Sequence, residues 1–416
     1  MAAVPFGSEQ CPHCGVVPAP AALYCGQCGT ALVPPPGTVG APCGPLVAGL
    51  GCGVVLLLGF ALTTLAILIL NVPDPVALFI AMALATLPVG LYALLIISLD
   101  RYEKDAPWLP ALAFVWGAVV AVVMSFIMEV VLEAAGRAVL GAQVTEVGGS
   151  VVFAPWTEEF FKGAALLVLF LGWKADFDDV LDGIVFGSLV ALGFAMTENV
   201  IYYGSAAREG GLASAGVSFV LRGVFGAFGH ATYTAFFGAG LGWARESAAP
   251  LAKAVGPVGG FLLAVLNHTL WNAICDIVDR LAEHTQSMTV VFASLPVGHG
   301  MLTLPAMVAL LVMAWLGWRR QRQVMDVWLA DEVAAGVVTP EEYDLLTSGR
   351  ASLPIELRML TRGGGRAWLA TRRLFRTEAQ LAFEKWRLAR GFRNATVGRR
   401  RVGALRRQIL ALRSCF

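Results

Sequence analysis

Two adjacent glutamates and a lysine stand inside an otherwise apolar stretch of the chain. Glu158, Glu159 and Lys162 fall in a run that is hydrophobic from Val151 to Leu171, and a run of that length can span a bilayer. An ionisable side chain in hydrocarbon persists only where it faces a partner or water, so each one is a candidate for function. On a helix, Lys162 can pair with either carboxylate, because it follows them by four and three residues.

Further polar residues occur in later apolar runs. His268 and Asn272 are four residues apart and would share one helix face, and His230 lies on another of these runs. A carboxylate pair with two imidazoles and an amide can activate water and hold an oxyanion, with one glutamate as general base. Glu198 and Arg222 are interpreted as a supporting ion pair. The Glu and His side chains also suit Zn²⁺, so the sequence leaves an active-site metal open.

Eight apolar runs would have to position these residues. The 416 residues are 57% hydrophobic and 14% charged, against about 25% charged in ordinary globular domains, which excludes a typical water-soluble fold. Each run approaches the ~20 residues that cross a bilayer as a helix. The predicted fold is all-α, a polytopic transmembrane bundle of about eight helices. The runs are 46–70, 76–99, 107–128, 151–171, 180–201, 217–243, 255–275 and 289–318.

Basic residues predict the orientation of the chain. An even number of spans returns both termini to one side, and 20 of the 30 Lys and Arg follow Trp318, against 9 Asp and Glu. Because Lys and Arg accumulate on the cytoplasmic face, both termini are predicted to be cytoplasmic in a multi-pass protein of the cell membrane. The glutamates then lie in the outer half of the bilayer, at the depth of His230 and His268.

The basic tail, residues 319–416, is predicted to be helical. Thr339-Pro340-Glu341-Glu342 is typical of a helix start, with the hydroxyl as cap and proline in the first turn. Arginines interleaved with Leu, Phe and Trp favour contact with anionic lipid, and nucleic acid is the less favoured partner.

The N-terminal segment is predicted to form a zinc ribbon. Cys11, Cys14, Cys25 and Cys28 form two Cys-x-x-Cys pairs, a spacing typical of a tetrahedral structural Zn²⁺ site. A reducing cytosol favours metal over a disulfide at such cysteines. The predicted domains are the ribbon (1–33), a Pro-rich linker (34–45), an eight-helix transmembrane domain (46–318) and the basic tail (319–416).

Three other acidic residues are left out of the predicted site. Asp182, at the inner end of the fifth run, is interpreted as a helix-start group. Glu129 and Glu133 follow the third run and are expected to face water.

Short motifs carry a resemblance to a known family. They are Ala154-Pro155, Glu158-Glu159-x-x-Lys162, Asp182-Gly183 with Gly187, Gly193-Phe194-Ala195, Glu198-Asn199 with Tyr202, Arg222, His230-Ala231 and His268-x-x-Trp271-Asn272. In this order they resemble the PrsW family of intramembrane proteases over about residues 76 to 318. That family is similar to the wider group containing the CAAX prenyl proteases and bacteriocin-processing immunity proteins.

The resemblance implies a helical-bundle endopeptidase with a membrane-anchored protein substrate. Its catalytic residues would match Glu158, Glu159, His230 and His268, with Asn272 as a further match. In the family's best-known role the substrate is an anti-sigma factor, cut first near the outer interface. Two other classes compete: a proton-coupled transporter or channel, whose buried Glu and His relay protons, and a non-catalytic membrane scaffold or sensor with a zinc ribbon.

Overall fold

Helices make up nearly all of the part of the chain that the structure describes, and no strand occurs in that part. The computed structural model describes residues 43–100, 102, 108–348 and 353–413, with side chains from Leu56 onward apart from short gaps. The four ribbon cysteines and most of the predicted linker lie outside the described residues. The chain divides into two units, one of Gly53–Arg320 and one that includes the segment from Gln321 onward.

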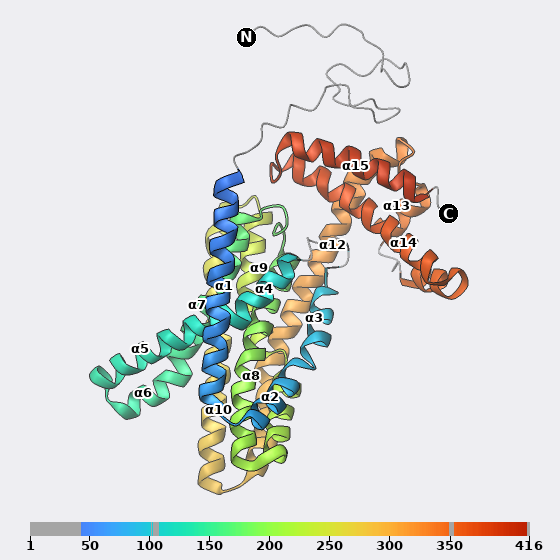
Figure 1. Cartoon of the computed structure of the whole chain (residues 1–416). Coiled ribbons are helices and arrows are strands. Elements are labelled where there is room, and N and C mark those ends of the chain that lie inside the picture. The colour runs from blue at the N-terminus through green and yellow to red at the C-terminus, as the bar shows by residue number, and fades with distance from the viewer. Residues whose placement is uncertain (1–42, 101, 103–107, 349–352, 414–416) are drawn as a thin grey trace. The chain divides into compact units, whose positions relative to one another are not determined.

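The helices up to α12 follow one another with short connections, and π-helical turns (η) extend several of them (Figure 1). In order they are α1 (Cys43–Asn71), α2 (Pro75–Thr86), α3 (Val89–Ile97), α4 (Trp108–Val115), η1 (Trp116–Ala121), α5 (Val122–Leu140), α6 (Ala142–Gly148), η2 (Gly149–Phe153), α7 (Ala154–Gly172), α8 (Val180–Ser218), η3 (Phe219–Phe225), α9 (Gly229–Glu246), α10 (Pro250–Thr285), α11 (Met288–Gly298), η4 (His299–Thr303) and α12 (Leu304–Ala334).

Five helical segments are long and apolar enough to cross a membrane. They are Pro75–Ile97, Trp108–Leu140, Val180–Glu246, Pro250–Thr285 and Met288–Ala334. The predicted all-helical, polytopic character is thereby confirmed, whereas the predicted number of eight spans is not. The difference has three sources: Val180–Glu246 contains both the fifth and the sixth predicted runs, the first run is represented by the shorter apolar helix Leu56–Asn71, and α7 carries both glutamates and the lysine within its 19 residues.

A capping box starts α8. The Asp179 side chain accepts a hydrogen bond from the Asp182 backbone N–H at 3.0 Å, and the Asp182 side chain accepts one from the Asp179 N–H at 3.1 Å. Such reciprocal bonds satisfy N–H groups that a first helical turn leaves without partners. The interpretation of Asp182 as a helix-start group is confirmed. Gly210 and Gly211 later leave helical geometry, after which the chain returns through η3 into α9.

Direct backbone contact fixes how α8 packs on α9. A Cβ at Gly183 would lie 2.0 Å from the carbonyl oxygen of Gly238, and one at Gly187 would lie 2.9 Å from that of Thr234. Small residues permit this approach in membrane helices. A step of four residues forward on α8 matches four backward on α9, so the two helices run antiparallel in a single register.

The same kind of contact joins α9 to α10. A Cβ at Gly240 would lie 2.1 Å from the carbonyl oxygen of Gly256, and the close approach continues at Gly260. Following this antiparallel register along both helices brings His230 level with the turn that carries His268. Their ring centroids are 4.8 Å apart, so the glycine contacts determine where the two histidines meet.

We expect Gly238→Ala to destabilise the first unit. The new Cβ would lie 1.9 Å from the Gly183 carbonyl oxygen, and overpacking of this kind costs roughly 1–3 kcal/mol. Thermal unfolding of the detergent-solubilised full chain measures the effect. Gly216→Ala on α8 is the matched control, since its Cβ would have nothing within 4 Å. Equal melting temperatures for the two variants would contradict the glycine-contact account.

The second unit contains three more helices. They are α13 (Pro340–Thr347), α14 (Leu353–Ala389) and α15 (Ala395–Arg413). The predicted helix start at Thr339 is confirmed, because the Thr339 hydroxyl accepts from the Glu342 N–H and the Glu342 carboxylate accepts from the Thr339 N–H. Glu332 is fully buried and pairs with Lys385 at 2.8 Å and with Arg406 at 2.7 Å. Part of the basic charge of the tail therefore neutralises carboxylates inside it.

We expect the stability of the tail to fall with rising pH because of Glu378. Burial and the charge of Glu342 raise the pKa of its carboxyl to about 9, whereas an unfolded glutamate titrates near ~4.3. The folded tail therefore keeps a proton that the unfolded chain releases. The contribution of Glu378 to the free energy of unfolding is fully present below about pH 4 and is lost as pH rises toward 9. Every tenfold difference in proton affinity between the folded and unfolded chain contributes at most about 1.4 kcal/mol to the free energy of unfolding.

Glu378→Gln removes this titration and should flatten the pH dependence. Hydrogen exchange of α14 and α15 amides in the full chain, corrected for intrinsic rates, would compare the variants at pH 6 and pH 8.5. Glu341→Gln, at an exposed residue on α13, is the control. A wild-type tail with equal protection at both pH values would argue against a protonated Glu378.

Candidate active site

Lys162 is the centre of a buried polar cluster on α7. Its side chain is 0% exposed, and its ammonium donates to Glu158 Oε2 and to Glu159 Oε1, each at 3.0 Å. The ammonium also lies 3.1 Å from His230 Nδ1 and 3.9 Å from the ring centroid of Phe194. The sequence predicts that Lys162 can pair with either glutamate, and in the structure it pairs with both, because residues four and three apart share one side of the helix.

Glu159 is held on both oxygens. Its Oε1 lies 3.1 Å from His268 Nδ1 and accepts from the lysine, and its Oε2 accepts a 2.7 Å hydrogen bond from the Thr234 hydroxyl. His268 is itself buried and stacks on the ring of Tyr233, with centroids 5.2 Å apart. Because three partners hold the Glu159 carboxylate in place, it can fix the orientation of the His268 imidazole.

Glu198 holds the second histidine in a similar way. Its Oε2 lies 3.1 Å from His230 Nε2, and its Oε1 pairs with Arg222 at 3.0 Å. The guanidinium in turn donates to Asn199 at 2.9 Å and lies over the ring of Tyr202. The predicted ion pair of Glu198 with Arg222 is therefore present, and it reaches the histidine directly.

The remaining nitrogen of each histidine is turned toward Glu158. His230 Nδ1 and His268 Nε2 each lie 3.9 Å from Glu158 Oε2. Among the described residues, Glu158 Oε2 accepts a hydrogen bond from Lys162, and Glu158 Oε1 accepts none. The structure therefore distinguishes the two glutamates: Glu159 is fully engaged, whereas Glu158 faces two imidazoles and retains an oxygen for a further partner.

One predicted site residue of the described part lies apart from this cluster. Asn272 lies one turn beyond His268 on α10, but its amide donates to the backbone carbonyl of Ser150 at 2.9 Å, so it ties α10 to η2 and does not contact the glutamates. The cysteines predicted to bind zinc (Cys11, Cys14, Cys25 and Cys28) lie outside the described residues.

Glu129 is a residue of this region that the sequence did not reveal. The expectation that it faces water is wrong, because it is half-buried on α5 and its Oε1 lies 3.0 Å from the hydroxyl of Thr157. Thr157 directly precedes Glu158. The signal that could have found it is the distance between Glu129 and the end of its helix: α5 continues to Leu140, so Glu129 is an interior residue of a candidate span.

Comparison with known proteins matches the sequence of this region to a family. Residues 105–299 match the model of the PrsW family. Its description is "PrsW family intramembrane metalloprotease". The chain is also 33% identical over 118 residues to "Protease PrsW" from Oceanobacillus iheyensis, which covers 28% of this chain and 49% of that protein. The chain thus matches about half the length of this relative, and no solved structure matches it.

The PrsW description implies a metal, and the donors present fit one. One ligand atom each from Glu158, His230 and His268 lie within 4.8 Å of one another. Two imidazoles and a carboxylate are a common set for catalytic zinc. Histidine ligands are usually backed by a carboxylate on the other nitrogen, and Glu198 and Glu159 occupy those positions here.

Proposed function

We propose that this chain is an intramembrane endopeptidase that hydrolyses a peptide bond of a membrane-anchored protein. One observation carries the proposal: two histidines, each backed by its own carboxylate, direct their remaining nitrogens at Glu158. A structural ion-pair network needs no such arrangement, whereas activation of water does. The match to the PrsW family over residues 105–299 supports the same class.

In this proposal Glu158 acts on the attacking water. Its unengaged oxygen accepts the proton of that water, and the Lys162 ammonium, which donates to Oε2, favours the ionised form of the carboxylate. With their other nitrogens held by Glu198 and Glu159, His230 and His268 accept from the water and orient it, and an imidazole that has taken up a proton donates to the oxyanion that forms on the peptide carbonyl. Glu159 and Glu198 act through these histidines, since they contact the imidazoles and not the space in front of Glu158.

A metal at the same site is the alternative to these roles. Glu158, His230 and His268 would hold it, and a zinc ion there would supply Lewis-acid polarisation of the peptide carbonyl. The carboxylates of Glu159 and Glu198 would then fix the orientation of the ligand imidazoles.

We further propose a placement in the membrane and a substrate class. Both termini are cytoplasmic, as the basic tail favours, so cleavage takes place near the outer interface. The substrate is a single-span protein such as an anti-sigma factor. Exposed arginines of the tail contact anionic lipid, and a zinc ribbon formed by the N-terminal cysteines regulates or localises the enzyme.

Cleavage by the purified full chain tests the proposal. The protein in liposomes would be incubated with single-span reporter proteins, with and without a chelator, while proton flux is measured in parallel. We expect cleavage within or next to the span, and loss of cleavage on chelation that zinc restores. Metal content of the full chain is compared with that of Cys25→Ala, because the predicted ribbon binds zinc independently. Proton-coupled flux without cleavage of any reporter would favour the transporter class instead.

A further inference from the structure

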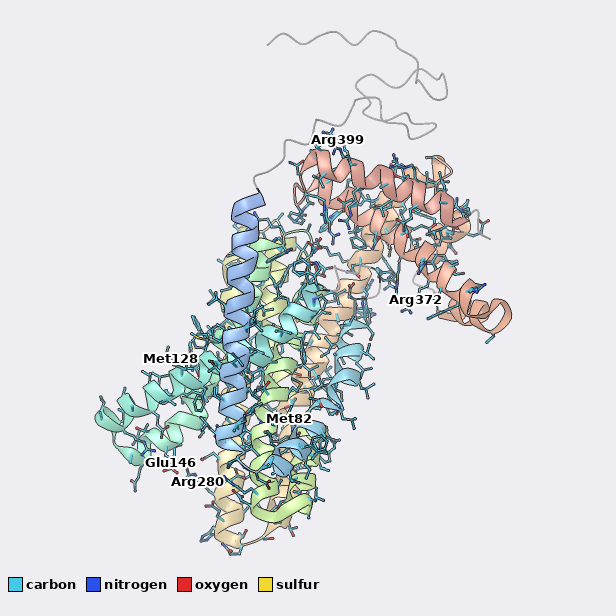
Figure 2. The ribbon with its side chains drawn as sticks, viewed as in Figure 1. Met82, Met128, Glu146, Arg280, Arg372 and Arg399 are labelled. Atoms are coloured by element: carbon cyan, nitrogen blue, oxygen red, sulfur yellow. The ribbon has the colours of Figure 1, made fainter. Side chains whose placement is uncertain are left out.

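Glu129 lies on the hairpin of α5 and α6. In Figure 1 this hairpin projects from the other helices of its unit, and Figure 2 labels Met128, the neighbour of Glu129. Around Glu129 the surface of α5 is apolar: Phe126 is 41% exposed and Val130 is 51% exposed. A carboxylate in such surroundings is costly unless it has a partner.

The partner that Glu129 has within the chain is weak. The Thr157 hydroxyl lies 3.0 Å from Glu129 Oε1 and 3.0 Å from the carbonyl oxygen of Ala154, so its single proton serves one acceptor at a time. No ion pair to Glu129 occurs among the described residues. A half-buried carboxylate with one shared hydroxyl retains the capacity to bind a cation.

The polar cluster around Glu129 contains more carboxyl groups than permanently charged cations. Glu129 lies near enough to interact electrostatically with Glu158, Glu198 and Lys162. The cluster gathers four carboxyl groups, on Glu129, Glu158, Glu159 and Glu198, around the two cations of Lys162 and Arg222. A metal held by Glu158 and the histidines would offset charge at those ligands, and Glu129 is not one of them.

We propose that Glu129 is a specificity-determining residue that binds a basic side chain of the substrate near the cleaved bond. Lys and Arg are frequent beside membrane spans, where their long stems lie on apolar surface while the charge reaches a polar group. The apolar surface of α5 around Glu129 suits such a stem. Thr157 joins this subsite to the adjacent Glu158, so the bound cation would lie close to the reacting peptide. This role for Glu129 rests on the proposed protease function.

A charge-swap experiment on the full chain tests it. A single-span reporter that the wild type cuts is mapped by mass spectrometry, and each residue near the cleaved bond is replaced in turn by Lys, Gln or Glu. At one of these positions we expect kcat/KM to be higher for Lys than for Glu by about tenfold or more, the effect of ~1.4 kcal/mol. Glu129→Gln should abolish this preference, and Glu129→Lys should invert it.

Control variants separate recognition from a structural role. Glu133→Gln changes an exposed glutamate one turn further along α5, paired with Arg137, and should leave the preference intact. If Glu129→Lys lowers cleavage of all reporters equally, Glu129 is structural and the inference fails. A wild type that cuts Lys and Glu reporters at equal rates also overturns the inference, but not the protease function. A wild type that cuts no reporter overturns both.

Discussion

Glu158→Gln is expected to lower the rate of reporter cleavage by about 10² to 10⁴-fold, the usual contribution of a general base. The amide keeps the shape of the side chain and an oxygen for the Lys162 ammonium, so the packing of α7 should persist. It cannot take a proton from water, and it is a poor metal ligand. The measurement is single-turnover cleavage in liposomes, with thermal unfolding recorded on the same sample.

Glu133→Gln is the matched control for this prediction, because it removes a carboxylate that is exposed and paired with Arg137. Its cleavage rate should equal that of the wild type. Glu159→Gln should also slow cleavage, but through His268, and it should lower stability because it disturbs three buried contacts. Wild-type cleavage by folded Glu158→Gln would sink the assignment of this residue.

Lys162→Met is expected to destabilise the first unit by roughly 3–5 kcal/mol, the range for removing one partner of a buried ion pair. The lysine side chain is fully buried between two carboxylates. Without it, the two carboxylates that share its ammonium would have no cation on α7. We expect a lower melting temperature in detergent and loss of cleavage.

The triple variant Glu158→Gln, Glu159→Gln and Lys162→Met tests the cause of that loss. It removes all three charges together, so it should recover much of the stability while remaining inactive. Lys174→Met, at an exposed lysine beyond the end of α7, should behave like wild type. If the triple variant is as unstable as Lys162→Met alone, electrostatic imbalance is not what destabilises the single variant.

The local features of the fold were predictable from sequence, because each depends on neighbours along the chain. The helix starts that involve Asp182 and Thr339 follow from the hydrogen-bonding capacity of a few consecutive residues. The hairpin of α5 and α6 was not predicted. Helix α5 continues beyond the end of the predicted apolar run, and the chain reverses at Gly141. The φ of 84° at this residue favours glycine, but a glycine in the sequence does not indicate the direction in which α5 projects.

The polar cluster was predictable in composition but not in detail. The cost of burying Glu158, Glu159 and the histidines indicated that they should meet. Which glutamate retains an unengaged oxygen depends on Thr234, whose hydroxyl occupies Glu159 Oε2. A threonine in an apolar helix does not indicate a polar contact in the way that a buried charge does. The different surroundings of the two glutamates are therefore visible only in the structure.

The glycine contacts between α8 and α9 also constrain how this chain tolerates insertions. Roughly two helical turns separate His230 from Gly238, and one inserted residue would rotate the histidine by about 100° around the axis of α9. Because Gly238 is locked against Gly183, the helix cannot turn back to compensate. A change of loop length leaves the spacing between His230 and Gly238 unaltered, whereas an insertion between these two residues would turn His230 away from His268.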